Sequence, residues 1–225
     1  MQIGFSTADL YEHPEQLSRD ILDKQISLGA SAIEVNAGAS MIRTKLLEIP
    51  ADSFKSFERK FLHAPGSLDK TILDEIIVIQ KKFNFEYINF HPNGVFDFDV
   101  LAKSGLPVCI ENMDSRKQDF VSVQDMQKVL DKYPFGMVLD INHAYTNEAN
   151  LDLANEFWNK LGDRIKYFHL SGFTTLHEPL YKTKQNRLID FVESKNVPVV
   201  IECMLDNLDE LEKEWYYIMD NLTDV

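Results

Sequence analysis

The stretch Gly136-Met-Val-Leu-Asp140, followed directly by Ile-Asn-His143, shows a pattern that recurs along the chain. An apolar run of strand length ends in a carboxylate and an imidazole. Seven further runs of similar length lie at residues 2–6, 32–36, 61–65, 87–91, 108–112, 165–169 and 197–202. Such nearly continuous apolar runs are typical of strands that are buried on both faces of a parallel sheet.

The starts of these runs are 21 to 32 residues apart, which is the length of a strand, a loop, a helix and a return loop. Between the runs, apolar residues recur at helical spacing. The sequence predicts helices over residues 17–26, 72–80, 120–132, 151–161, 185–194 and 208–219, with shorter ones near Phe54 and Phe98. Eight alternating units are the number that closes a barrel.

We therefore expect residues 1–225 to form a single α/β domain, a (β/α)8 TIM barrel. An open doubly wound sheet is the competing arrangement. Its usual phosphate-binding loop is missing, because Ser6-Thr-Ala-Asp-Leu10 after the first run contains no glycine-rich motif.

The composition indicates a folded protein of acidic character. The 225 residues include 23 Lys and Arg against 36 Asp and Glu, for a net charge of −13, which argues against broad binding of nucleic acid. Cys109 and Cys203 are expected to be buried thiols of a reducing compartment. The N-terminus does not resemble a signal peptide, and no apolar run is long enough to span a bilayer, so we expect a cytoplasmic protein without a membrane partner.

Nearly every apolar run ends in a side chain that could bind a metal ion. These residues are His63, His91, Glu111, Asp140 with the nearby His143, His169 and Glu202. In a barrel, the carboxyl ends of the strands surround one site. Charged groups buried there without partners would each cost several kcal/mol, so a bound divalent cation is the simplest explanation.

Other polar residues have more ordinary interpretations. Glu34 is as well explained by a structural ion pair as by a role in the site. His13 is expected in a solvated loop, and the charged run Asp114, Arg116 and Lys117 in another. Four cationic residues could contact a phosphate, and spacing does not choose among them: Arg43, Lys166, Lys182 and Lys184.

An ordered set of short motifs resembles the xylose isomerase-like TIM-barrel superfamily, which includes endonuclease IV of the AP-endonuclease family 2 type and sugar isomerases and epimerases. The motifs are Leu62-His-Ala-Pro65, Asn89-Phe-His-Pro-Asn-Gly94, Ile110-Glu-Asn112, Leu139-Asp-Ile-Asn-His143, Phe168-His-Leu-Ser171, Leu176-His-Glu-Pro-Leu180 and Ile201-Glu202. The resemblance covers essentially the whole chain.

The resemblance implies a ligand set. Glu111, Asp140, His169 and Glu202 match the four-ligand centre of the superfamily, which holds Mn²⁺ or a similar ion in the epimerases. With Glu111, His63 and His91 match the ligands of a further zinc in endonuclease IV, and His143 and His177 match two ligands of its third zinc. Thr175 stands where that pattern has an aspartate, so either Glu178 replaces it or the third ion is absent.

These matches favour a divalent-metal-dependent isomerase or epimerase of a small sugar or sugar phosphate, with one to three Zn²⁺ or Mn²⁺ ions per chain. Glu111, Glu202 and His143 are the expected catalytic residues. The alternatives are an endonuclease IV-like zinc phosphodiesterase and a barrel that only binds a metabolite. The acidic balance and short loops disfavour DNA as a partner without ruling it out. The oligomeric state is left open.

Overall fold

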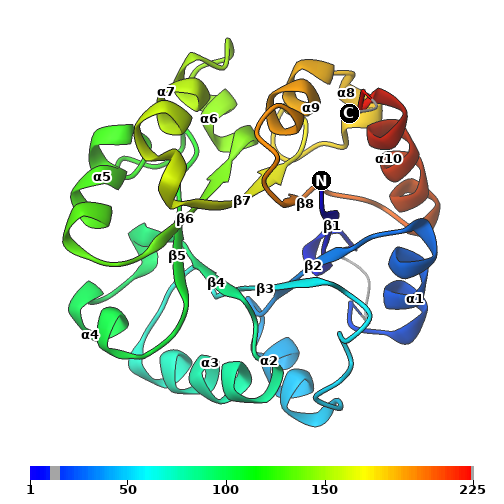
Figure 1. The fold of residues 1–225 in the computed structure, drawn as a ribbon. Coiled ribbons are helices and arrows are strands. Elements are labelled where there is room, and N and C mark those ends of the chain that lie inside the picture. The colour runs from blue at the N-terminus through cyan, green and yellow to red at the C-terminus, as the bar shows by residue number, and fades with distance from the viewer. Residues whose placement is uncertain (11–15, 224–225) are drawn as a thin grey trace.

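Eight parallel strands form a closed barrel within residues 1–10 and 16–223, the part of the chain that the computed structural model describes (Figure 1). They are β1 (Ile3–Ser6), β2 (Ala32–Asn36), β3 (Arg59–His63), β4 (Tyr87–Phe90), β5 (Val108–Glu111), β6 (Gly136–Asp140), β7 (Ile165–Leu170) and β8 (Val199–Ile201). They follow chain order around the barrel, and β8 pairs with β1. The predicted (β/α)8 TIM barrel is confirmed. His13 lies outside the described residues.

The helices form an outer ring around the strands (Figure 1). They are α1 (Arg19–Leu28), α2 (Ser40–Glu48), α3 (Lys70–Phe83), α4 (Phe98–Lys103), α5 (Val123–Lys132), α6 (Ile141–Asn147), α7 (Asp152–Leu161), α8 (Leu180–Thr183), α9 (Asn186–Glu193) and α10 (Leu208–Asn221). Short 3-10 turns occupy Thr7–Leu10, Pro92–Gly94 and Gly162–Arg164. Side chains at several helix starts accept backbone N–H groups, as Ser18 does for α1 and Asp69 for α3. None of the described helices is both long and apolar enough to cross a bilayer.

Some predicted boundaries are wrong. The helix expected near Phe54 does not form; Phe54 lies in a turn and packs against Phe83 and Phe85, with ring centroids 5.2 and 6.1 Å away. The helix of that segment is α2, which ends before it. The sequence pattern also missed α6, because Ile141 continues the apolar run of β6 without a break.

The core has two parts. The larger lies between the strands and the surrounding helices. The smaller fills the interior of the barrel and consists of Ala32, Phe61, Cys109, Val138, Tyr167 and Val200. The rings of Phe61 and Tyr167 stack there with centroids 4.1 Å apart. Both cysteines are buried free thiols, as expected. This apolar inner layer forms a floor beneath the polar side chains described next.

Candidate metal centre

The polar side chains inside the barrel occupy the layer next to its apolar floor. Each floor residue is followed two positions later by a polar residue. The pairs are Ala32 and Glu34, Phe61 and His63, Cys109 and Glu111, Val138 and Asp140, Tyr167 and His169, and Val200 and Glu202. Because side chains alternate along a strand, all six polar side chains point into the barrel. They lie at the carboxyl ends of the strands, where barrel enzymes carry their active sites.

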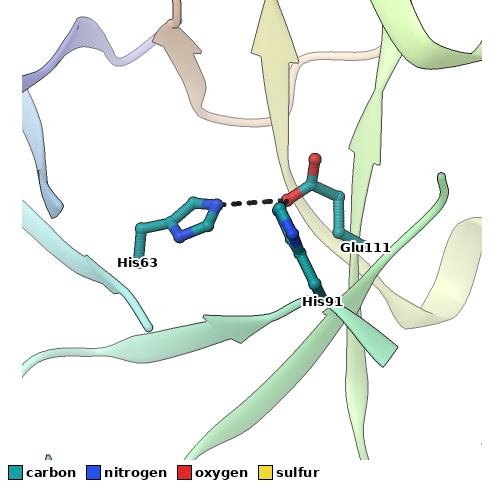
Figure 2. A group of neighbouring side chains, drawn as sticks. All are labelled: His63, His91 and Glu111. Carbon is teal, nitrogen blue, oxygen red and sulfur yellow. Dashed lines mark ion pairs between the residues drawn. The ribbon is translucent and has the colours of Figure 1, made fainter. Parts of the chain in front are cut away.

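A first donor group consists of His63, His91 and Glu111. The two imidazoles are directed at the Glu111 carboxylate (Figure 2). Nε2 lies 3.5 Å from Glu111 Oε2 in His63 and 3.6 Å from it in His91. These distances are long for hydrogen bonds. They suit ligands that share an ion, since atoms about 2.1 Å from a tetrahedral ion lie roughly 3.4 Å apart. His63 Nδ1 donates to the Ala64 carbonyl at 2.8 Å, which leaves Nε2 free for the ion.

A second donor group consists of Asp140, His143 and His177. The Nε2 atoms of the two histidines lie 3.3 Å apart. His143 Nδ1 donates to the Asn112 carbonyl at 2.9 Å, so Nε2 is the nitrogen that an ion could bind once it replaces the proton there. Asp140 also accepts the backbone N–H of His143, which begins α6 and turns that imidazole back toward the barrel axis. Two imidazole nitrogens this close require a proton or a cation between them.

A third donor group, formed by Glu111, Asp140, His169 and Glu202, connects the other two. His169 Nδ1 lies 2.9 Å from Glu202 Oε2, 3.7 Å from Glu111 Oε1 and 3.8 Å from Asp140 Oδ2. Glu111 Oε1, Asp140 Oδ2 and His169 Nδ1 are buried, and among the described residues their close contacts lack the geometry of hydrogen bonds. Unsatisfied buried polar atoms are costly, and three that converge fit a divalent cation.

Glu34 contacts the candidate ligand His169 on the side away from the third donor group. Its Oε2 accepts hydrogen bonds from His169 Nε2 at 3.1 Å and from the Tyr167 hydroxyl at 2.5 Å. The opposite nitrogen of His169 therefore faces the third donor group. The carboxylate is fully buried. The structure combines the two interpretations left open by the sequence, because the ion pair that Glu34 forms is with His169, a candidate ligand that it would orient.

Mutual contacts set the protonation of these groups. Burial alone would raise the pKa of the Glu111 carboxyl, but the facing imidazoles of His169 and His91 lower it well below its ordinary value. Burial lowers the pKa of His91 to about 4, so this imidazole is neutral at pH 7. Burial also opposes a charged His63, yet the contact with Glu111 raises the pKa of His63 to about 9. The carboxylates attract positive charge, which an ion can supply in place of protons.

A cavity of about 210 Å³ opens over the donor groups. Its wall includes the four residues His63, His91, His143 and His177, the carboxylates Glu111 and Glu202, and the non-ligand residues Asn36, Met113, Asp114, Arg116 and Lys117. The expectation of a solvated loop is wrong for Asp114, which is 3% exposed. Arg116 and Lys117 are exposed, but they border the cavity. The position of this segment directly after β5 was the available signal, because strand-to-helix loops build the sites of barrels.

Glu178 does not join the second donor group. Its carboxylate accepts the backbone N–H groups of Thr174, Thr175 and Leu176 and so stabilises its own loop. The structure gives no support to the alternative in which Glu178 replaces the missing aspartate. Asp140 completes the group instead.

No protein-family model and no curated protein matches this chain. Solved structures do match it. The 3-keto-D-glucoside 4-epimerase of E. coli is 12% identical with a TM-score of 0.66, covering 98% of this chain and 99% of that one. A xylose isomerase domain containing protein from Salmonella typhimurium is 13% identical with a TM-score of 0.67, covering 98% and 97%. A probable 3-DHS dehydratase from Bacillus anthracis is 14% identical with a TM-score of 0.66, covering 99% and 100%.

The chain has the fold of the xylose isomerase-like barrels. In this barrel, the eight residues predicted as ligands all lie in the three donor groups. The metal-binding role of each remains a prediction. The residues that the sequence did not single out for the site are the cavity residues Asn36, Met113, Asp114, Arg116 and Lys117, together with Asn89, which donates to Glu111.

Proposed function

We propose that this protein is a divalent-metal-dependent isomerase or epimerase of a small sugar or sugar phosphate. The observation that carries the proposal is the convergence of Glu111 and Glu202. The two carboxylates come from β5 and from the end of β8, which lie on different sides of the barrel (Figure 1), and they meet in one donor group and border one cavity. A substrate in this cavity would lie against both carboxylates.

Two facing carboxylates can carry out the proton transfers of such a reaction. One removes a proton from the carbon next to a carbonyl, and the other returns a proton to the substrate. The Glu202 side chain is 16% exposed and is the more accessible of the two, since the Glu111 side chain is 1% exposed. A divalent ion held by the third donor group would polarise the carbonyl and hydroxyl oxygens of the substrate. His143 lies 3.1 Å from Glu111 and can hold a proton beside it.

A specific observation favours the second candidate, an endonuclease IV-like zinc phosphodiesterase. Glu111 belongs to two donor groups and Asp140 to two, the arrangement expected of carboxylates that bridge neighbouring ions. Several ions held together can stabilise the attacking and leaving oxygens of a phosphodiester. The net charge of −13 argues against a nucleic-acid substrate. The third candidate, a barrel that only binds a metabolite, is disfavoured because Glu111 and Glu202 both face the cavity.

The test is a Glu202→Gln variant assayed beside wild type on a panel of sugars and sugar phosphates in deuterated water. Proton relay predicts deuterium at the carbon next to the carbonyl in wild type and a loss of turnover of about 100-fold or more in the variant. The exposed Glu48→Gln on α2 is the matched control. Full activity of Glu202→Gln would reject the proposed role. Cleavage of an abasic oligonucleotide together with three zinc ions per chain would favour the phosphodiesterase.

A further inference from the structure

The loop between β5 and α5 places two cationic residues at the cavity. Arg116 and Lys117 border it together with candidate ligands from five other parts of the barrel. The four cations that the sequence offered for a phosphate are absent from the wall of this cavity. Arg43, for example, is buried and bound to Glu75 and to the Ala37 carbonyl, and Lys182 pairs with Glu210 on α10.

Arg116 is held in one orientation. Its Nε and Nη2 donate to the two oxygens of Asp114 at 2.7 and 2.8 Å, and its backbone N–H donates to the same carboxylate at 2.8 Å. Asp114 is buried and anchors the guanidinium, although the Arg116 side chain is 59% exposed. Among the described residues, Nη1 has no hydrogen-bond partner. The guanidinium thus keeps free donors in a fixed position, an arrangement suited to a planar or tetrahedral anion.

Lys117 adds an unneutralised charge. Its backbone N–H donates to the Asp114 carbonyl at 3.0 Å, which closes the turn, and no described carboxylate lies within ion-pair distance of its ammonium group. Asp114 offsets one of the two cations, so residues 114–117 retain one positive charge; Asp119, further along the same loop, does not border the cavity. In a chain with a net charge of −13, this turn at the cavity differs in sign from the molecule as a whole.

We propose that Arg116 and Lys117 bind the phosphate group of the substrate, which is then a small sugar phosphate and not a neutral sugar. This inference rests on the proposed function and adds the substrate class to it. The cavity of about 210 Å³ is smaller than the roughly 300–1,000 Å³ of most ligand pockets, which limits its occupant to a small molecule. A sugar that contacts Glu111 and Glu202 at the centre can extend its phosphate to the rim, where Arg116 supplies the donors and Lys117 the charge.

The test measures binding of inorganic phosphate to the metal-loaded protein by calorimetry. The variants are Arg116→Gln, Lys117→Gln and the two combined, and exposed Lys103→Gln on α4 is the matched control. We expect about tenfold weaker binding in the double variant, since charge-assisted hydrogen bonds are lost. Phosphate can also bind the metal ions directly. That binding is the same in wild type and in every variant whose metal content is unchanged, so it does not affect the difference between them. Equal affinity of wild type and double variant would overturn the proposal.

Two further measurements separate this inference from the proposed function. Arg116→Gln also removes the partner of Asp114 and could disturb the loop. Lys117→Gln does not have this effect, because the Lys117 side chain pairs with no described carboxylate. The proposal therefore requires that Lys117→Gln alone weakens phosphate binding and leaves the melting temperature unchanged. If phosphate binding depends on both residues but no sugar phosphate is isomerised, the proposed function fails while the phosphate site stands. Two results would overturn the sugar phosphate assignment. One is that wild type and the double variant convert a neutral sugar at the same rate. The other is that wild type cleaves an abasic oligonucleotide and the double variant does not.

Discussion

Glu34 decides which nitrogen of His169 faces the candidate ions. The imidazole is bound at Nε2 by a buried carboxylate that is itself held by Tyr167, and its Nδ1 points to Glu202. A carboxylate behind a metal-binding histidine fixes the ring and increases its basicity. Glu34 therefore acts through His169 and is a positioning residue.

We expect Glu34→Gln to bind Zn²⁺ or Mn²⁺ about tenfold more weakly than wild type, because a neutral amide orients the ring but supplies less charge. Competition with a chelator measures the affinity. Tyr167→Phe is the graded control, since it removes one hydrogen bond to Glu34 and keeps the ring stacked on Phe61. Unchanged affinity in Glu34→Gln would contradict the positioning role.

At the scale of the elements, the strand ends were predictable and the loops were not. An apolar residue followed two positions later by a ligand-type residue, as in Val138 and Asp140, fixes both the strand and the direction of its side chains. The loop after β5 lacks this alternation: its position after a strand indicates that it lies near the site, but only the folded chain shows that Asp114 is buried and that Arg116 borders the cavity. The α2 helix was missed because Met41 and Leu47 are exposed apolar residues, which weakens its helical pattern.

The contacts between α8 and α10 lead to a prediction about the stability of the fold. Glu210 on α10 accepts hydrogen bonds from the Tyr181 hydroxyl at 2.6 Å and from Lys182 Nζ at 2.8 Å. Partial burial opposes ionisation, but these contacts lower the pKa of the Glu210 carboxyl to about 2. Because the folded pKa lies below the unfolded value, the stabilisation is complete above about pH 4.5 and is lost as the pH falls toward 2.

We therefore expect Glu210→Gln to lower the free energy of unfolding by about 1 kcal/mol at pH 7. The difference from wild type should shrink as the pH falls from 4.5 toward 2. Urea unfolding at pH 7, 5 and 3 measures both effects. Glu212→Gln, on the same helix and in a more exposed ion pair with Lys24, should cost less. A difference between wild type and Glu210→Gln that is the same at pH 7 and 3 would contradict the assigned pKa.

At the scale of the whole molecule, the interior of the barrel concentrates negative charge that the fold itself does not neutralise. Glu111, Asp140 and Glu202 lie in the third donor group, and Glu34 forms a further group with His63 and Glu202. In the protein without ions, their fields attract protons. Burial opposes this, yet Asp140 and Glu111 raise the pKa of His143 to about 10. A cation that enters must displace such protons, so metal binding, proton release and stability are linked.

This linkage predicts the direction in which ion removal changes the melting temperature and in which pH changes the affinity for the ion. Removal of ions with a chelator should lower the melting temperature at pH 8 by about 5 to 10 °C, since an ion at 100 times its dissociation constant stabilises by about 2.7 kcal/mol. The affinity should weaken as the pH falls from 8 to 6, because the imidazoles of His63 and His143 bind protons more strongly than usual in the ion-free protein. Thermal melts with and without chelator at both pH values, with elemental analysis of the same samples, measure both effects. Affinity that increases toward pH 5, or a melting temperature that the chelator leaves unchanged at pH 8, would mean that the convergent imidazoles and carboxylates hold no ion.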